Sequence, residues 1–230
     1  MMDPAKAGLA QRIYDRLTGA DRRRERAAII RQLPDRRLLI DVYIPAFAAE
    51  AGRILWVGCR AYTLDDYKAL ESGGGEVWTT DLDPRAEKWG RRGRHRTGDL
   101  CGVDEVFLDI TFDAIICNGV FGYGVDTPDQ QLAAMRAMAM ILRPGGRLLL
   151  GWNTDKISDP VVEGRSWLWC DPVSFAGQPT RVRFDEVTHT YDTLVRKRSM
   201  TRSAIDPKAT FCSRPISENA LNATGGPLTS

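Results

Sequence analysis

The sequence predicts an α/β protein with a mostly parallel sheet and helices on both faces, and three apolar runs carry this prediction. The first run, at 54–57, ends at Gly58, as expected of a strand that is buried on both faces. Residues 77–80 form a second run, with Asp81 at its carboxyl end, and a third lies at 112–117. The first two runs, with helical spacing between them, form the βαβ unit of a nucleotide-type site.

Length and composition fit one domain of this class. The chain has 230 residues, of which 43% are apolar and 27% charged, and its net charge of +2 gives no argument for a nucleic-acid or membrane partner. No stretch approaches the ~18 unbroken apolar residues of a membrane span. The cysteines contain no C-x-x-C pair, which indicates reduced thiols in a cytoplasmic protein. They are Cys59, Cys101, Cys117, Cys170 and Cys212.

Residues 1–50 are expected to be helical. Apolar residues recur at helical spacing through 9–33, and a further helical segment at 38–47 is expected to bend near Pro45. The charged run 22–26 is either a phosphate-binding patch or the solvated face of a helix, and the second interpretation is favoured.

The turn after the first strand separates two classes of cofactor. From Gly58 it runs Gly-Cys-Arg-Ala-Tyr-Thr, with one glycine, whereas a dinucleotide fingerprint has the pattern G-x-G-x-x-G. A pyrophosphate needs several glycines so that backbone amides can surround it, and a cofactor without phosphate does not. Helical spacing over 64–70 leads to the glycines at 73–75 and the second strand. Asp81 then stands where a carboxylate can hold both hydroxyls of a ribose.

A basic segment precedes the third strand. Pro84 is suited to the first turn of a helix, which is predicted to run to about Arg92. The run 91–96 is either a contact for an anionic substrate or a solvated turn, and the turn is favoured. Gly98 and Asp99 follow it.

The fourth strand is predicted at 112–117, followed by a loop from Asn118 to Gly124. Ligands of open parallel sheets lie beyond the carboxyl ends of strands where the strand order reverses, so Asn118 should face the site. Three glycines in this loop indicate a backbone that bends around a ligand, and a flexible loop is the alternative.

The remaining segments follow in order. A helix from Thr127 with a methionine-rich core face leads into 142–153, where a Pro-Gly-Gly turn precedes a buried fifth strand. Residues 157–175 suit a loop and a short helix, and 188–195 alternate as a late strand. Residues 199–230 are expected to form a flexible C-terminal tail.

Five motifs give the chain a resemblance to one enzyme family. The run I-L-W-V-G-C at the first strand and the L-x-P-G-G turn before the fifth are accompanied by C-N-G-V-F-G-x-G, G-W-N and a late H-T-Y-D. The sequence resembles the class I (Rossmann-like) S-adenosylmethionine-dependent methyltransferases over about residues 50–198. It departs from the family pattern at Arg60 and Tyr62, where glycines are usual, and at Trp56, where an acid is common.

The resemblance implies a Rossmann-like methyltransferase sheet that ends in an antiparallel hairpin. Residues 51–198 would form the S-adenosylmethionine-binding domain, with 1–50 as an N-terminal cap or lid of the same domain. Asp81 would hold the ribose, and Asp99 the adenine. The full set of implied cofactor-binding residues is Gly58, Cys59, Arg60, Tyr62, Asp81, Leu82, Asp99, Asn118 and Gly119.

The acceptor of the methyl group is expected to be a small molecule. Asn118 and Tyr123 are the catalytic candidates, Asn153 is a further candidate on the acceptor side, and a structural role is favoured for His189. No N-P-P-Y-type run follows the fourth strand, which disfavours nucleic-acid bases as acceptors, and no cluster indicates a metal. A non-catalytic member of the family and, with less support, a nucleotide-dependent oxidoreductase are the alternatives.

Overall fold

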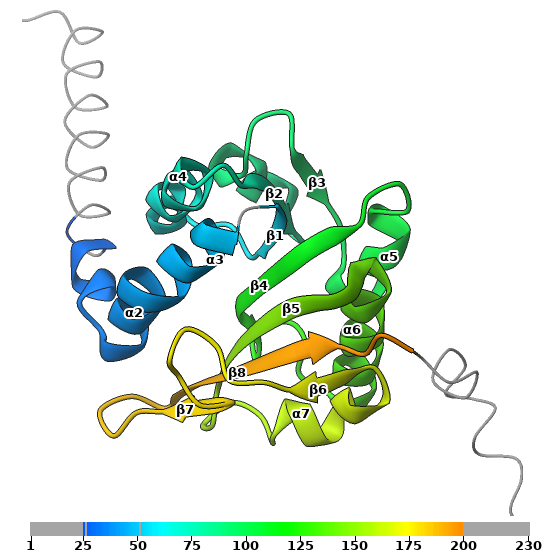
Figure 1. The fold of residues 1–230 in the computed structure, drawn as a ribbon. Helices are drawn as coiled ribbons and strands as arrows, with labels where there is room; N and C mark the ends of the chain where they lie inside the picture. Colours follow the sequence, from blue (N-terminus) through cyan, green and yellow to red (C-terminus); the bar gives the residue numbers. More distant parts are fainter. Residues whose placement is uncertain (1–24, 26, 51, 200–230) are drawn as a thin grey trace, which may run out of the picture. The chain divides into compact units, whose positions relative to one another are not determined.

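The computed structural model describes residues 25, 27–50 and 52–199, and an eight-stranded sheet runs through them (Figure 1). The predicted helical pattern before residue 25, most of the charged run 22–26 and the tail beyond residue 199 lie outside the described residues. Along the sheet the order is β3-β2-β1-β4-β5-β8-β6, and β7 also pairs with β8. The predicted mostly parallel sheet with an antiparallel end is confirmed.

Five parallel strands place the site. They are β1 (Arg53–Val57), β2 (Glu76–Asp81), β3 (His95–Thr97), β4 (Phe112–Phe121) and β5 (Leu142–Asn153). Four of the five residues of β1 are buried, because helices cover both faces of the sheet (Figure 1). Since the strands are parallel, the residues that follow β1, β2 and β3 meet the second half of β4 at one edge.

The fourth strand is longer than predicted. Asn118 and Gly119 were expected in a loop, but both belong to β4. Asn118 pairs with Gly151 of β5, and the ladder resumes at Phe121 opposite Trp152. The register shifts between Asn118 and Phe121, and Gly119 has a φ of 73°. The predicted backbone bend is therefore a bulge within the strand, followed by a turn with two more positive-φ glycines.

The segment before β1 is one helical stretch: α2 (Pro34–Leu38), the π-helix η1 (Leu39–Tyr43) and α3 (Ile44–Glu50). The Ile44 amide donates to the carbonyl of Leu39, five residues back. Pro45 has no amide hydrogen and its ring crowds the preceding turn, so the wider π turn before it takes the place of the predicted bend. Tyr43 packs edge-on against Tyr191, with ring centroids 5.5 Å apart, which attaches this stretch to the sheet.

Helices flank the sheet on both sides. They are η2 (Ala61–Thr63), α4 (Leu64–Ser72), η3 (Pro84–Trp89), η4 (Leu100–Gly102), α5 (Val103–Val106), α6 (Pro128–Ile141), α7 (Pro160–Glu163) and η5 (Ser166–Leu168). In Figure 1, α2, α3 and α4 lie on one face, and α5 and α6 lie on the other. None of the helices in this part of the chain is long and apolar enough to cross a membrane.

The basic segment at 91–96 is tied to the fold by ion pairs. Arg91 and Arg94 both contact Glu71, at 2.6 and 2.9 Å, and Arg96 contacts Asp109 at 2.6 Å. The interpretation as a turn is thus favoured by the structure. The preceding helix is a 3₁₀ helix that ends at Trp89, three residues earlier than predicted. A side chain at the next position, Gly90, would collide with the ring of His95.

The antiparallel end of the sheet consists of β6 (Cys170–Pro172), β7 (Arg181–Arg183) and β8 (His189–Arg196). A buried carboxylate on β8 joins it to β5 and β7: Asp192 accepts hydrogen bonds from Trp152 Nε1 at 2.8 Å and from Arg181 Nε at 2.5 Å. Arg181 also pairs with Asp159 at the start of α7. One guanidinium thus bridges two carboxylates, and the Trp152 N–H gives the buried Asp192 a further donor.

Candidate functional site

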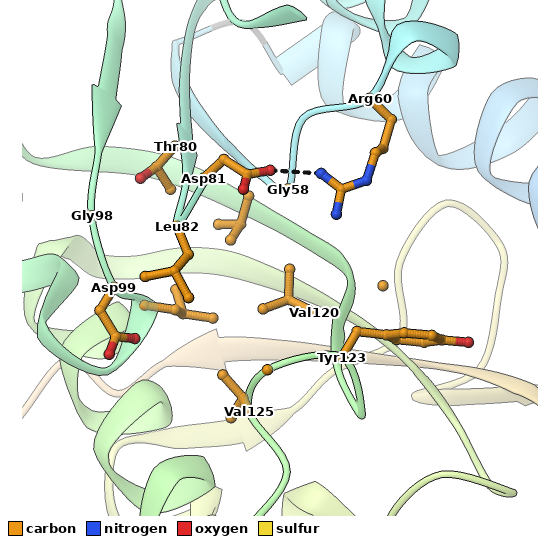
Figure 2. A pocket seen from close by; sticks show the side chains of 14 residues that line it. Gly58, Arg60, Thr80, Asp81, Leu82, Gly98, Asp99, Val120, Tyr123 and Val125 are labelled. Atoms are coloured by element: carbon orange, nitrogen blue, oxygen red, sulfur yellow. Dashed lines mark hydrogen bonds and ion pairs between the residues drawn. The ribbon is translucent and has the colours of Figure 1, made fainter. Parts of the chain in front are cut away.

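A pocket opens at the carboxyl ends of β1, β2 and β4 (Figure 2), and we call it the strand-end pocket. It lies where the strand order reverses, as expected for the ligand site of an open parallel sheet. Its lining comprises Val57, Gly58, Arg60, Thr80, Asp81, Leu82, Gly98, Asp99, Leu100, Gly119, Val120, Tyr123, Gly124 and Val125.

Gly58 turns the chain at the end of β1. Its φ is 86°, and a Cβ atom would lie 3.2 Å from the side chain of Val120 across the pocket. Its amide donates to the carbonyl of Thr80 at 2.9 Å, which extends the pairing of β1 with β2. The backbone conformation therefore favours glycine here, and a side chain would also crowd Val120.

Asp81 is the buried acid of the pocket. Its Oδ2 accepts hydrogen bonds from the Cys59 amide at 2.8 Å and from Arg60 Nη1 at 2.9 Å, while its Oδ1 accepts one from the Asp83 amide at 2.9 Å. Figure 2 shows the Arg60 side chain reaching across to this carboxylate. Asp83 instead caps η3 and pairs with the exposed Arg85, and it is not part of the lining.

Two residues on the far side of the pocket complete it. Leu82 is 63% exposed and presents an apolar side chain to the opening (Figure 2). Asp99 caps η4, because its Oδ1 accepts a hydrogen bond from the Cys101 amide at 2.9 Å. A ligand at this end would meet an apolar surface and a carboxylate.

Cys59 and Tyr62, both predicted at the cofactor, lie elsewhere. Cys59 is fully buried, its Sγ lies 3.7 Å from the carbonyl of Thr80, and burial raises the pKa of its thiol to about 11. Its backbone reaches the site: the amide donates a hydrogen bond to Asp81, and the carbonyl accepts one from Arg60 Nη1 at 2.7 Å. Tyr62 lies in a second cleft, where Arg36 stacks over its ring at 4.9 Å.

This second cleft, which we call the lid cleft, has a volume of about 810 Å³. Helical residues before β1 form one side, and the ends of β4, β5 and β8 form the other. The lining comprises Ala27, Ile30, Leu33, Asp35, Arg36, Arg60, Ala61, Tyr62, Trp89, Asn118, Gly119, Tyr123, Asn153, Val187, Thr188 and His189. Arg60, Gly119 and Tyr123 line both this cleft and the strand-end pocket.

The predicted acceptor-side residues Asn118, Tyr123 and Asn153 are brought together in the lid cleft. Asn118 Nδ2 donates to the hydroxyl of Tyr191 at 3.0 Å, and Tyr123 is 58% exposed between the two cavities. Sequence reasoning missed Asp35 and Arg36, because nothing in a charged helical segment shows that an aspartate will be buried beneath it.

Comparison with known proteins identifies the domain. Residues 55–150 match the family model described as a methyltransferase domain. A search of curated proteins finds no match. N-methyltransferase NodS from Bradyrhizobium japonicum has a TM-score of 0.53 and 17% identity, over 73% of this chain and 99% of that one.

Two further structures have the same score. The TehB-like SAM-dependent methyltransferase from Corynebacterium glutamicum has a TM-score of 0.53 and 19% identity, over 85% of this chain and 100% of that one. The structure of NodS in complex with S-adenosyl-l-homocysteine has a TM-score of 0.53 and 17% identity, over 72% of this chain and 89% of that one. At these identities the structures share the fold, and the family model supplies the chemistry. Residues 55–150 thus form a methyltransferase domain, and the described part of the chain shares the fold of S-adenosylmethionine-dependent methyltransferases.

Proposed function

We propose that this domain methylates a small molecule bound in the lid cleft. The observation that carries the proposal is the shared wall: Arg60, Gly119 and Tyr123 line both the strand-end pocket and the lid cleft. Two ligands in these cavities would lie side by side, as a donor and an acceptor of a methyl group must. Proximity and orientation of this kind supply much of the rate of a group transfer.

The residues of the strand-end pocket fit the cofactor. Asp81 with Leu82 would hold the ribose, Asp99 the adenine, and the turn at Gly58 with Gly119 the methionine portion. When bound, the cofactor supplies a methyl group already activated on a positively charged sulfur.

Arg60 must move for the cofactor to enter. The pocket has a volume of only about 60 Å³, whereas ligand sites for small molecules are roughly 300–1,000 Å³. Arg60 is half exposed, so its ion pair with Asp81 contributes only about 0–1 kcal/mol and is readily exchanged for the ribose hydroxyls. The displaced guanidinium remains on the wall of the lid cleft.

The lid cleft favours a small acceptor with an apolar or aromatic body. Tyr62, Trp89 and Tyr123 supply aromatic surface, and Asn118 can orient a polar group beside the cofactor. In this proposal the helical residues before β1 act as the lid. The arginines of 91–96 are engaged by acids on the protein, which argues against a basic surface for nucleic acid. The buried free thiols Cys59, Cys117 and Cys170 suit a reducing, cytoplasmic location.

Labelled S-adenosylmethionine tests the proposal directly. Incubation with cell extract divided into small-molecule, RNA and protein fractions should transfer label to the small-molecule fraction. Asn118→Ala should lower this transfer strongly while S-adenosylhomocysteine binds with nearly unchanged affinity, because a contact that orients the acceptor acts mainly in the transition state. Label in RNA or protein alone, or full turnover by Asn118→Ala, would contradict it.

A further inference from the structure

A chain of hydrogen bonds fixes the tautomer of His189. The carboxylate of Asp155 accepts the hydroxyl hydrogen of Thr188 at 2.7 Å. The Thr188 oxygen is therefore free to accept from Asn153 Nδ2, at 3.0 Å, which turns Asn153 Oδ1 toward His189 Nδ1 at 3.2 Å. An amide oxygen can only accept, so Nδ1 carries the hydrogen and Nε2 carries a lone pair.

Three hydrogen-bond acceptors of the lid cleft have no partner among the described residues. They are His189 Nε2, Asn118 Oδ1 and Asp35 Oδ1, and each belongs to a side chain that is 6–7% exposed. The first two lie close together, since a Cβ atom at Gly151 would be 2.8 Å from His189 Nε2 and 2.5 Å from Asn118 Oδ1. Buried polar atoms are normally hydrogen-bonded, so three unpartnered acceptors in one cleft point to a ligand that brings donors.

We propose that the methyl acceptor is an amine whose N–H groups bond to His189 Nε2 and Asn118 Oδ1. This inference rests on the proposed function and names its substrate class. The three atoms are buried in the described conformation, so the amine reaches them as the side chains of the lid cleft shift around it. Carboxylates, phosphates and thiolates have no hydrogen to donate there.

The chemistry of the transfer also favours an amine. The amine binds in its neutral form, after its ammonium proton has passed to water. Its lone pair forms the N–C bond, the C–S bond breaks with its electron pair passing to sulfur, and the positive charge moves from sulfur to nitrogen. The hydrogen bonds that the amine donates to His189 and Asn118 strengthen as its nitrogen becomes positive, which stabilises the transition state. The methylated ammonium later loses a proton to water.

An alcohol would need a base, and His189 is a poor one. Burial, and after it the nearby Arg36, lowers the pKa of His189 to about 3. An alcohol hydroxyl has a pKa far above that of this imidazolium, so proton transfer to this imidazole is strongly unfavourable. His189 is therefore an orienting hydrogen-bond acceptor for a nucleophile that needs no deprotonation at the moment of transfer.

The tautomer can be measured without turnover. The chain has two histidines, so the His95→Gln variant leaves His189 as the only imidazole signal in a long-range ¹H–¹⁵N spectrum. At pH 7 the spectrum should show a protonated Nδ1 and an unprotonated Nε2. Asp155→Asn in the same background should mix the two tautomers. The new side-chain amide can donate as well as accept, so it no longer fixes the hydroxyl of Thr188 as a donor. A protonated Nε2 in the His95→Gln protein would overturn the inference.

Matched acceptor probes test the substrate class. Benzylamine and phenethylamine, offered with labelled S-adenosylmethionine, should gain label, while benzyl alcohol and phenethyl alcohol should not. His189→Phe should lower kcat/KM for the amines about ten- to hundredfold, as expected for a bond to a group that gains charge, with the affinity for S-adenosylhomocysteine retained.

The outcomes separate the two proposals. Label in the alcohols, or in neither pair while S-adenosylhomocysteine binds, overturns the amine inference and leaves the proposed function standing. If S-adenosylhomocysteine does not bind and no extract fraction gains label, the proposed function fails as well.

Discussion

Replacing Asp81 with asparagine isolates the contribution of one negative charge to cofactor binding. The wild-type carboxylate would accept two ribose hydroxyls, and charge makes each such bond roughly 1 kcal/mol stronger than its neutral counterpart. Exchanging Arg60 for the ribose offsets up to about 1 kcal/mol of that gain. The net loss is about 1–2 kcal/mol, so the Kd for S-adenosylhomocysteine should rise about five- to thirtyfold.

The same substitution also lowers the stability of the fold. Asp81 also accepts hydrogen bonds from the backbone amides of Cys59 and Asp83, one on each carboxylate oxygen. An asparagine can serve only one of them, and the other amide is left without a partner at a cost of about 1–3 kcal/mol. For a domain of this size each kcal/mol lowers Tm by about 2–4 °C, so binding has to be compared at 20 °C, where the variant remains folded.

Isothermal titration calorimetry with S-adenosylhomocysteine measures the loss. Asp83→Asn is the matched control, since it removes a carboxylate two residues away that caps η3 outside the pocket. Its Kd should stay within about twofold of wild type, because surface ion pairs contribute little. Equal losses in the two variants, or wild-type affinity in Asp81→Asn, would refute the assignment of the ribose to Asp81.

Three further predictions concern the lid cleft. Gly151→Ala places a Cβ atom 2.5 Å from Asn118 Oδ1 and should cost about 1–3 kcal/mol in urea unfolding, whereas Gly102→Ala meets open space and should be neutral. Tyr123→Ala should raise the KM for the acceptor more than the Kd for the cofactor, since the side chain lies exposed between the two cavities; the reverse pattern would place it on the cofactor. His189 has a folded pKa of about 3, below its unfolded value of 6.5, so its stabilising effect is complete above pH 6.5 and declines as the pH falls toward 3. The unfolding free energy should therefore drop by about 2 kcal/mol between pH 7 and pH 5 through this group. Urea titration at both pH values should show a correspondingly smaller drop in the unfolding free energy of the His189→Phe variant.

The parallel half of the sheet was predictable because its strands are short, apolar and closed by residues with one clear role. Gly58 and Asp81 end their strands as expected, and the Pro-Gly-Gly turn leads into a buried β5. These features are local in sequence: burial on both faces produces an unbroken apolar run, and a tight turn requires glycine.

The parts that were not predicted depend on contacts between distant residues. β4 extends past Asn118 because Phe121 pairs with Trp152 on β5. The pairing of Arg60 with Asp81 spans 21 positions, and Asp35 becomes buried because its helix lies over the strand ends. Neither leaves a pattern of spacing in the sequence. The bond that orients the His189 ring comes from Asn153, 36 positions away on the neighbouring strand β5, so the sequence could not show it.

The position of Arg60 on the wall between the two cavities has a consequence for the energetics of ligand binding. In the described conformation its guanidinium neutralises Asp81, and cofactor entry would send that positive charge toward the lid cleft. Whatever factor this change contributes to the acceptor's affinity must appear, equal in size, when the acceptor is bound first and the cofactor second. The two sites are thus expected to be thermodynamically coupled, and Arg60→Gln should bring the coupling factor, measured by titrating each ligand with and without the other, closer to one.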